Sequence, residues 1–167
     1  GAISITPDAV ITATRSIDAG TGGNVTTSKI DGTVGQNFGL TINGNAVAVG
    51  AIGTVNANGI GSVSITGATS ITANGNITTG NTATPTTAIS LTAPTVTITS
   101  FTVDSGTAQN GRKISVITDT FLSASATVNA GTTGIFQIAP STATNTIDVF
   151  QGTQNDKANS VYDLGMA

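Results

Sequence analysis

A single local pattern recurs along the chain at a nearly constant distance. It is a short triplet of apolar, polar and apolar residues, as in Leu40-Thr41-Ile42. The triplets begin at Ile3, Leu40, Val63, Ile89, Ile114 and, in a weaker copy, Phe136. After the first interval of 37 residues, the spacing is 23, 26, 25 and 22 residues. Period-two alternation is typical of a β-strand with one buried face, and a repeat of this length is typical of a solenoid.

Each repeat contains two further apolar strands. The second strand begins seven or eight residues after the triplet, at Val10, Val47, Ile71, Val96 and Leu122. The third lies about fourteen residues after it, at Ile17, Val55, Ile77, Val103 and Val128. Asn and Gly, which tolerate positive φ, stand between the strands, as in Asn43-Gly44-Asn45. Three strands and three corners predict one coil of a parallel β-helix, which rises about 4.8 Å per coil.

The predicted fold is therefore all-β, a parallel β-helix of about six coils of 22–26 residues. We expect a single domain over residues 1–167. The long first interval predicts an insertion in the first coil, at residues 18–36, where Val25, Ile30 and Val34 are spaced like a side hairpin or an extra partial coil.

The composition fits this fold and excludes several functions. Only 8% of residues are charged, and the net charge is −3. Like charges stacked on adjacent coils would repel, so few are expected. The few bases argue against nucleic-acid binding, and the absence of His and Cys excludes a usual zinc site, thiol chemistry and a Ser-His-Asp triad. Apolar runs are too short for a helical membrane span.

Several segments resemble the repeats of large bacterial exoproteins related to filamentous haemagglutinin. The segment GIGSVSITGATSITANGNITTG at Gly59–Gly80 is similar to them, as is SLTAPTVTITSF at Ser90–Phe101. In Ile117–Asp148 a strand, the block TVNAG, a strand ending near Ala-Pro and a Thr-rich turn follow in the family's order. The Leu-Gly of Val161–Gly165 falls where such proteins often carry it. The resemblance covers about residues 40–165.

This resemblance implies a right-handed winding and a secreted or cell-surface location in a Gram-negative bacterium. It also implies an outer-membrane transporter as a partner during secretion. Members of the family act as adhesins, filaments or stalks. We therefore expect a segment of a longer rod that attaches to a host-cell, carbohydrate or other surface ligand.

The predicted insertion is the first candidate binding site, because binding residues concentrate on loops carried by a rigid scaffold. Its polar residues are Asp18, Asn24, Lys29 and Asp31. A second candidate is a threonine face formed by Thr95, Thr97 and Thr99. Flat stacked Thr-x-Thr ladders are typical of ice-binding solenoids, although Val47-Ala48-Val49 and Ser70-Ile71-Thr72 are expected to interrupt this one.

Other chemistry has weaker support in the sequence. Asn24 and Asn76 match the glycosylation sequon. Polysaccharide lyases and hydrolases with this fold need clustered acids, and the nearest pair, Asp104 and Asp119, occupies different offsets in its coils. We expect no catalytic residue, no metal site and no cofactor.

The function expected from the sequence is thus a non-enzymatic, secreted or surface-displayed adhesin or structural rod. Three alternatives stay open. The chain is a filament subunit that self-associates through its end coils, since neither end shows an obvious polar cap; it is an ice-binding solenoid; or it is a polysaccharide lyase or hydrolase.

Overall fold

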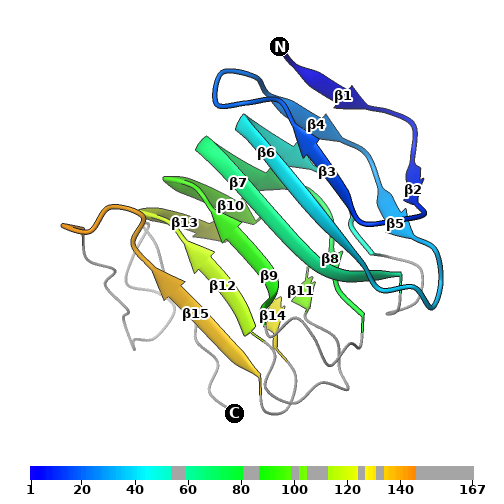
Figure 1. Cartoon of the computed structure of the whole chain (residues 1–167). Coiled ribbons are helices and arrows are strands. Elements are labelled where there is room, and N and C mark those ends of the chain that lie inside the picture. Colours follow the sequence, from blue (N-terminus) through cyan, green and yellow to red (C-terminus); the bar gives the residue numbers. More distant parts are fainter. Residues whose placement is uncertain are drawn as a thin grey trace.

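The computed structural model describes residues 1–53, 59–80, 87–98, 102–104, 113–123, 127–130 and 134–145, the side chains of 102–104 excepted. Within these ranges every regular element is a β-strand, and every pairing between strands is parallel. The strands wind into a β-solenoid of about four turns, seen in Figure 1 as a stack running from β1 to β15. The predicted parallel β-helix is confirmed; its right-handed winding stays a prediction.

The solenoid has three walls. Wall A contains β3 (Arg15–Asp18), the first parts of β6 (Phe38–Val49) and β7 (Ile60–Ala73), β9 (Thr87–Thr92), β12 (Lys113–Ile117) and β15 (Ile135–Ala139). Wall B contains β1 (Ile3–Ile5), β4 (Val25–Thr27), the ends of β6 and β7, β10 (Thr95–Ile98) and β13 (Thr120–Ser123).

Wall C is built from shorter strands. They are β2 (Ala9–Ile11), β5 (Ile30–Gly32), β8 (Ile77–Thr78), β11 (Thr102–Asp104) and β14 (Thr127–Asn129). Ile52 bridges β5 and β8 and so continues this wall through the intervening turn. Walls A and B form one continuous ten-stranded sheet, because β6 and β7 bend around the corner between them.

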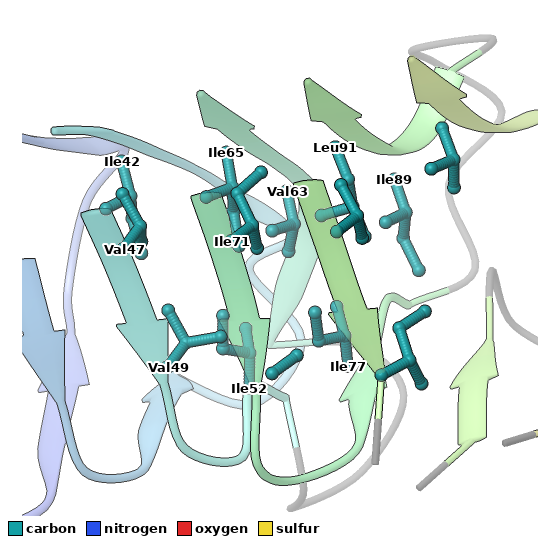
Figure 2. Close-up of a cluster of buried hydrophobic side chains, with 14 of the residues drawn as sticks. Ile42, Val47, Val49, Ile52, Val63, Ile65, Ile71, Ile77, Ile89 and Leu91 are labelled. Atoms are coloured by element: carbon teal, nitrogen blue, oxygen red, sulfur yellow. The ribbon is translucent and has the colours of Figure 1, made fainter. Parts of the chain in front are cut away.

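The core consists of columns in which equivalent side chains of successive turns stack inside the walls. In wall A, Leu40, Val63, Ile89 and Ile114 are successive partners and are at most 2% exposed. The predicted repeat spacing is therefore confirmed. Wall B contributes a second column, Val25, Val47, Ile71 and Val96, and wall C a third, Ile30, Ile52 and Ile77. Figure 2 shows side chains of all three columns filling the space between the walls.

Glycines stand where one turn of backbone lies directly on the next. Gly53 has φ 71°, and an added Cβ there would fall on the carbonyl oxygen of Thr78. Gly32 and Gly59 lie on successive turns, and an added Cβ on either would fall on the backbone carbonyl of the other. At Gly53 only glycine combines the positive φ with this close approach at no steric cost.

The first turn differs from the prediction. Ile3 pairs with Val25 and so belongs to wall B, Val10-Ile11 lies in wall C, and the wall A strand is β3, with Arg15 beside Leu40. The step from Arg15 to Leu40 is 25 residues, an ordinary turn, and the 12 residues from Ile3 to Arg15 make up the rest of the interval of 37.

Residues 18–36 are consequently not an insertion that forms a side hairpin. They contain β4 and β5, which lie in walls B and C with Val25 and Ile30 buried. The extra length of the first interval comes from β1 and β2, which form part of a turn before β3. Of the two predicted alternatives, the extra partial coil is therefore nearer to the structure, but it lies N-terminal to residues 18–36. The expected six coils slightly exceed the observed turns.

Two smaller assignments also change. Phe121 takes the inward position expected for Leu122, whose side chain is 44% exposed on the outside of wall B. Val55 lies outside the described residues. The other second and third strands are placed as predicted, with Val47, Ile71 and Val96 in wall B and Ile77, Val103 and Val128 in wall C.

The stacked columns yield a first prediction. Replacing Ile65, which is fully buried, by alanine should lower the free energy of unfolding by about 2 to 5 kcal/mol, because it leaves a cavity between Ile42 and Leu91. Ser64→Ala, on the outer side of the same strand, should change it by less than about 0.5 kcal/mol. Denaturant unfolding of the two variants measures this difference, and equal losses would contradict the assigned inner and outer sides.

Candidate functional site

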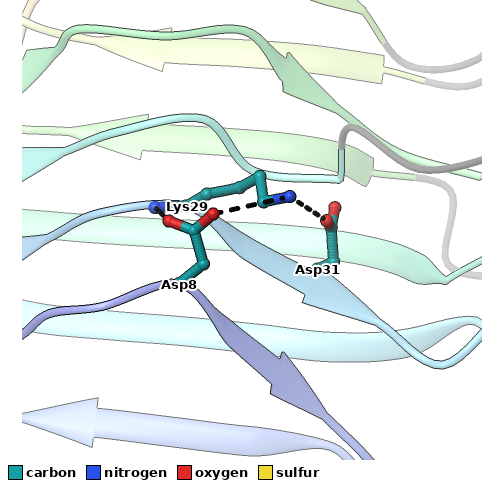
Figure 3. Close-up of polar contacts among 3 residues, drawn as sticks. All are labelled: Asp8, Lys29 and Asp31. Carbon is teal, nitrogen blue, oxygen red and sulfur yellow. Dashed lines mark hydrogen bonds and ion pairs between the residues drawn. The ribbon is translucent and has the colours of Figure 1, made fainter.

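The clearest group of charged side chains in the described residues lies on wall C. Lys29, just before β5, places its Nζ 3.3 Å from Asp31 Oδ2 and 3.6 Å from Asp8 Oδ2 (Figure 3). The backbone N–H of Lys29 also donates to Asp8 Oδ1 at 3.3 Å. Asp8 precedes β2, one turn away, so the cluster joins two adjacent turns.

The two carboxylates lie in different environments. The side chain of Asp31 is 6% exposed, whereas that of Asp8 is 60% exposed. A buried carboxylate needs hydrogen bonds and an opposite charge. The hydrogen bond and the charge of Asp31, followed by the charge of Asp8, raise the pKa of Lys29 above its usual value. The cluster thus holds a protonated lysine in place between two anions.

The predicted binding-loop residues do not form one loop. Asp18 ends β3 in wall A, and its Oδ1 accepts a hydrogen bond from the N–H of Gly20 at 2.8 Å, as in a tight turn. Asn24 precedes β4 in wall B, and its Oδ1 accepts from the N–H of Ala46 at 3.2 Å and from Asn45 Nδ2 at 3.4 Å. Only Lys29 and Asp31 are brought together, on wall C. Asp18 and Asn24 stabilise corners.

The predicted threonine face is part of wall B and extends beyond one strand. Thr95 and Thr97 point outward from β10 and are half-buried; Thr99 lies outside the described residues. Ser70 and Thr72 of β7 are their partners on the neighbouring turn. The prediction that Ser70-Ile71-Thr72 interrupts the threonine ladder is therefore wrong, because the hydroxyl groups of Ser70 and Thr72 continue the rows of Thr95 and Thr97.

The outer side of wall B carries two parallel columns, which we call the hydroxyl ladder. One column is Ser4, Thr26, Ala48, Thr72, Thr97 and Leu122, and the other is Ala46, Ser70, Thr95 and Thr120. Ala46 and Ala48 interrupt the hydroxyl groups at one turn, as the sequence predicted for that segment. None of the ten positions of this ladder carries a charge. Stacked turns place them about 4.8 Å apart along each column.

Other predicted features occupy separate places. Asn76 is exposed just before β8, while Asn24 already uses its amide oxygen to accept hydrogen bonds. Asp104 ends β11 in wall C, whereas Asp119 lies at the corner before β13 in wall B. The two carboxylate oxygens of Asp119 accept hydrogen bonds from Thr142: Oδ1 from its N–H at 2.9 Å and Oδ2 from its hydroxyl at 2.7 Å. These hydrogen bonds hold the pKa of Asp119 well below its usual range.

Sequence reasoning missed Asp8 and the full extent of the hydroxyl ladder. Asp8 is 21 residues from Lys29, close to one turn, and this spacing was the available signal. No group of three or more potential metal-ligating side chains occurs among the residues with described positions. The described ranges also include no helix with the length and apolar character needed to cross a bilayer.

Compared with known proteins, the chain matches no protein-family model, no curated protein and no solved structure. The assignment of function therefore depends on the fold and on the two surface features described above.

The charged cluster yields a second prediction. Lys29→Gln should lower the free energy of unfolding at neutral pH, because it removes the cation between Asp8 and Asp31. The two carboxylates raise the pKa of Lys29 in the folded protein above its value in the unfolded chain, which is about 10.4. Their contribution to the free energy of unfolding is complete below the unfolded pKa and is lost as the pH rises through the folded pKa. The difference between wild type and variant should therefore shrink in the alkaline range.

Chemical denaturation at a series of pH values measures this difference. Lys113→Gln is the control, since Lys113 forms no ion pair in the described part of the chain. A difference for Lys29→Gln that stays constant through the alkaline range would contradict the assigned role.

Proposed function

We propose that the chain is a non-enzymatic segment of a β-helical rod, secreted or displayed at a cell surface, that attaches to a surface ligand or presents one. The observation that carries this proposal is the hydroxyl ladder: an outer wall of uncharged side chains, most of them small, that stack at a regular spacing. The rod is the scaffold, and wall B is the contact surface.

Wall B is favoured over the other walls because both of its outer columns are uncharged. Its columns contain hydroxyl and methyl groups without charge, and exposed Leu122 adds an apolar contact at one end. The second outer column of wall A begins instead with Asp18 and Asn43. Wall C carries the charged cluster. A ligand with many hydroxyl groups, such as a surface polysaccharide, can exchange hydrogen bonds with the ladder at several turns at once, which raises avidity.

The position of the charges supports a binding role rather than catalysis. Lys29 is held between two carboxylates, and Asp119 is engaged by Thr142, so both contribute to the joining of adjacent segments. General acid–base catalysis needs a proton donor or acceptor beside a substrate site, with a pKa near the working pH. The pKa values of these two groups are moved away from that range.

The route to the surface is part of the same proposal. The similarity to filamentous-haemagglutinin-like exoproteins suggests export through an outer-membrane transporter. A chain without cysteine and with local, repeating contacts suits such export, because each turn folds onto the preceding one without disulfide formation.

Ice binding is a second candidate, and one observation favours it. Ser70 and Thr72 stack beside Thr95 and Thr97, so hydroxyl groups are repeated in two directions on this wall. A periodic solid is a natural ligand for such an array. Thermal hysteresis of the purified chain separates this candidate from attachment to a polysaccharide or a cell.

A paired-variant experiment tests the proposal. Thr72→Lys with Thr97→Lys puts two charges on adjacent turns of wall B, whereas Thr41→Lys with Ser64→Lys does the same on wall A, at equally half-buried positions. Binding is measured with a glycan array, with host cells and with ice. We expect the wall B variant to bind its ligand at least about tenfold more weakly, about 1.4 kcal/mol, and the wall A variant to be unchanged.

Equal loss in both variants, or binding to none of these surfaces by the wild type, would contradict the assignment of wall B. Turnover of a polysaccharide would contradict the non-enzymatic role.

A further inference from the structure

The tripeptide Asn-Gly-Asn occurs twice in the described ranges, in two different environments. One copy, at residues 43–45, lies inside β6, and the other, at residues 74–76, lies between β7 and β8. Asparagine before glycine is chemically labile, because the glycine has no side chain to hinder an attack of its backbone nitrogen on the asparagine amide. Since the two copies share the same sequence, the fold decides how each one reacts.

Asn74 stands at the corner where the chain passes from wall B to wall C. The residue is exposed, and its backbone N–H donates to the carbonyl oxygen of Val49 on the preceding turn at 2.8 Å. The N–H of Gly75, which supplies the attacking nitrogen, donates no hydrogen bond to a described residue. The attacking nitrogen is therefore not held in a strand pairing.

Position 75 requires glycine for a packing reason. A Cβ added to Gly75 would lie 2.7 Å from the backbone nitrogen of Ala51, which belongs to the preceding turn. A backbone atom cannot move aside as the end of a flexible side chain can. A side chain that would slow the attack is thus disfavoured here, and the corner stays labile as long as residue 74 is asparagine.

The first copy is protected by the sheet. Asn43 and Gly44 lie in the middle of β6, where they pair with Thr66 and Gly67 of β7. The carbonyl oxygen of Asn43 also accepts a hydrogen bond from the N–H of Ala19 at 3.0 Å, and Gly44 is buried. Ring closure requires the backbone to rotate out of the extended conformation, so the pairing on both sides of β6 would first have to open.

We propose that Asn74 is a site of spontaneous deamidation and isomerisation. The backbone nitrogen of Gly75 forms a bond to Cγ of Asn74, the bond from Cγ to Nδ2 breaks, and ammonia leaves. The proton lost by the attacking nitrogen balances the one taken up by the ammonia. Water then opens the succinimide ring. Opening at Cγ gives aspartate, whereas opening at the backbone carbonyl gives isoaspartate, in which the chain runs through Cγ.

The isoaspartate form lengthens this corner by one backbone carbon. Hydrogen bonds to the preceding turn fix the corner on both sides: Asn74 donates to Val49, and the N–H of Ile52 donates to the carbonyl oxygen of Asn76 at 2.7 Å. A longer connection strains these two bonds, so the reaction loosens the junction between walls B and C. This inference is independent of the surface ligand on wall B.

Peptide mapping by mass spectrometry tests the reaction after incubation of the folded wild-type chain at mildly alkaline pH. We expect Asn74 to convert at least about tenfold faster than Asn43, because an exposed corner opens more readily than the interior of a strand. In denaturant the two rates should become similar, since the tripeptide is the same. Equal rates in the folded chain, or no conversion of Asn74 there while the denatured chain reacts, would overturn the proposal.

The variant Asn74→Gln tests the structural consequence. It keeps the amide but would have to close a larger ring, so it should not react at this position. On incubation the denaturation midpoint of the wild type should fall further than that of Asn74→Gln, as isoaspartate accumulates. Isoaspartate is measured by labelling with an isoaspartyl methyltransferase. Equal falls in the two proteins would contradict the loosening of this corner.

Freshly prepared Asn74→Asp separates the new charge from the longer backbone. It carries the carboxylate without the isomerised link, and its denaturation midpoint should lie close to that of the fresh wild type. If it instead shows the full loss of the incubated wild type, the charge accounts for the effect, and the proposed role of backbone lengthening is wrong.

Discussion

Parallel pairing between successive turns is the interaction on which the rest of this structure depends. Each turn donates and accepts backbone hydrogen bonds along the solenoid axis, so every residue has as its neighbours the residues about one turn before and after it in the chain. Apolar side chains then stack in inward columns, and hydroxyl groups stack in outward columns. A charge in either kind of column would face its equivalents about 4.8 Å away. The low charge and the abundance of Thr, Ile, Val and Gly follow from this constraint.

The same constraint explains why most of the fold could be predicted. From Leu40 onward, the apolar triplets mark wall A without a register error, because stacking requires like residues at like positions. The first turn could not be placed in this way. Its wall A strand reads Arg15-Ser16-Ile17, which lacks the apolar residue that defines the triplet. Ile3-Ser4-Ile5, which fits the pattern, belongs to wall B.

The candidate sites were predictable to a smaller extent. Lys29 and Asp31 stand two residues apart, so their proximity is visible in the sequence. Asp8 becomes their neighbour only when the first turn is in register, and Ser70 joins the ladder only when serine is accepted as equivalent to threonine. Asp18 and Asn24 were grouped with Lys29 because they are near in sequence; in a solenoid, residues a third of a turn apart lie on different walls.

Residues one turn apart are direct neighbours in wall A, and disulfide formation between engineered cysteines tests this proximity most directly. Thr41, Ser64 and Ser90 occupy successive positions of one outer column. Neighbouring parallel strands bring Cα atoms within the range that a disulfide can bridge, whereas positions two turns apart lie beyond it. We expect Thr41→Cys with Ser64→Cys to form an intramolecular disulfide on mild oxidation, and Thr41→Cys with Ser90→Cys to form none. A disulfide in the second pair, or none in the first, would contradict the stacked-turn structure.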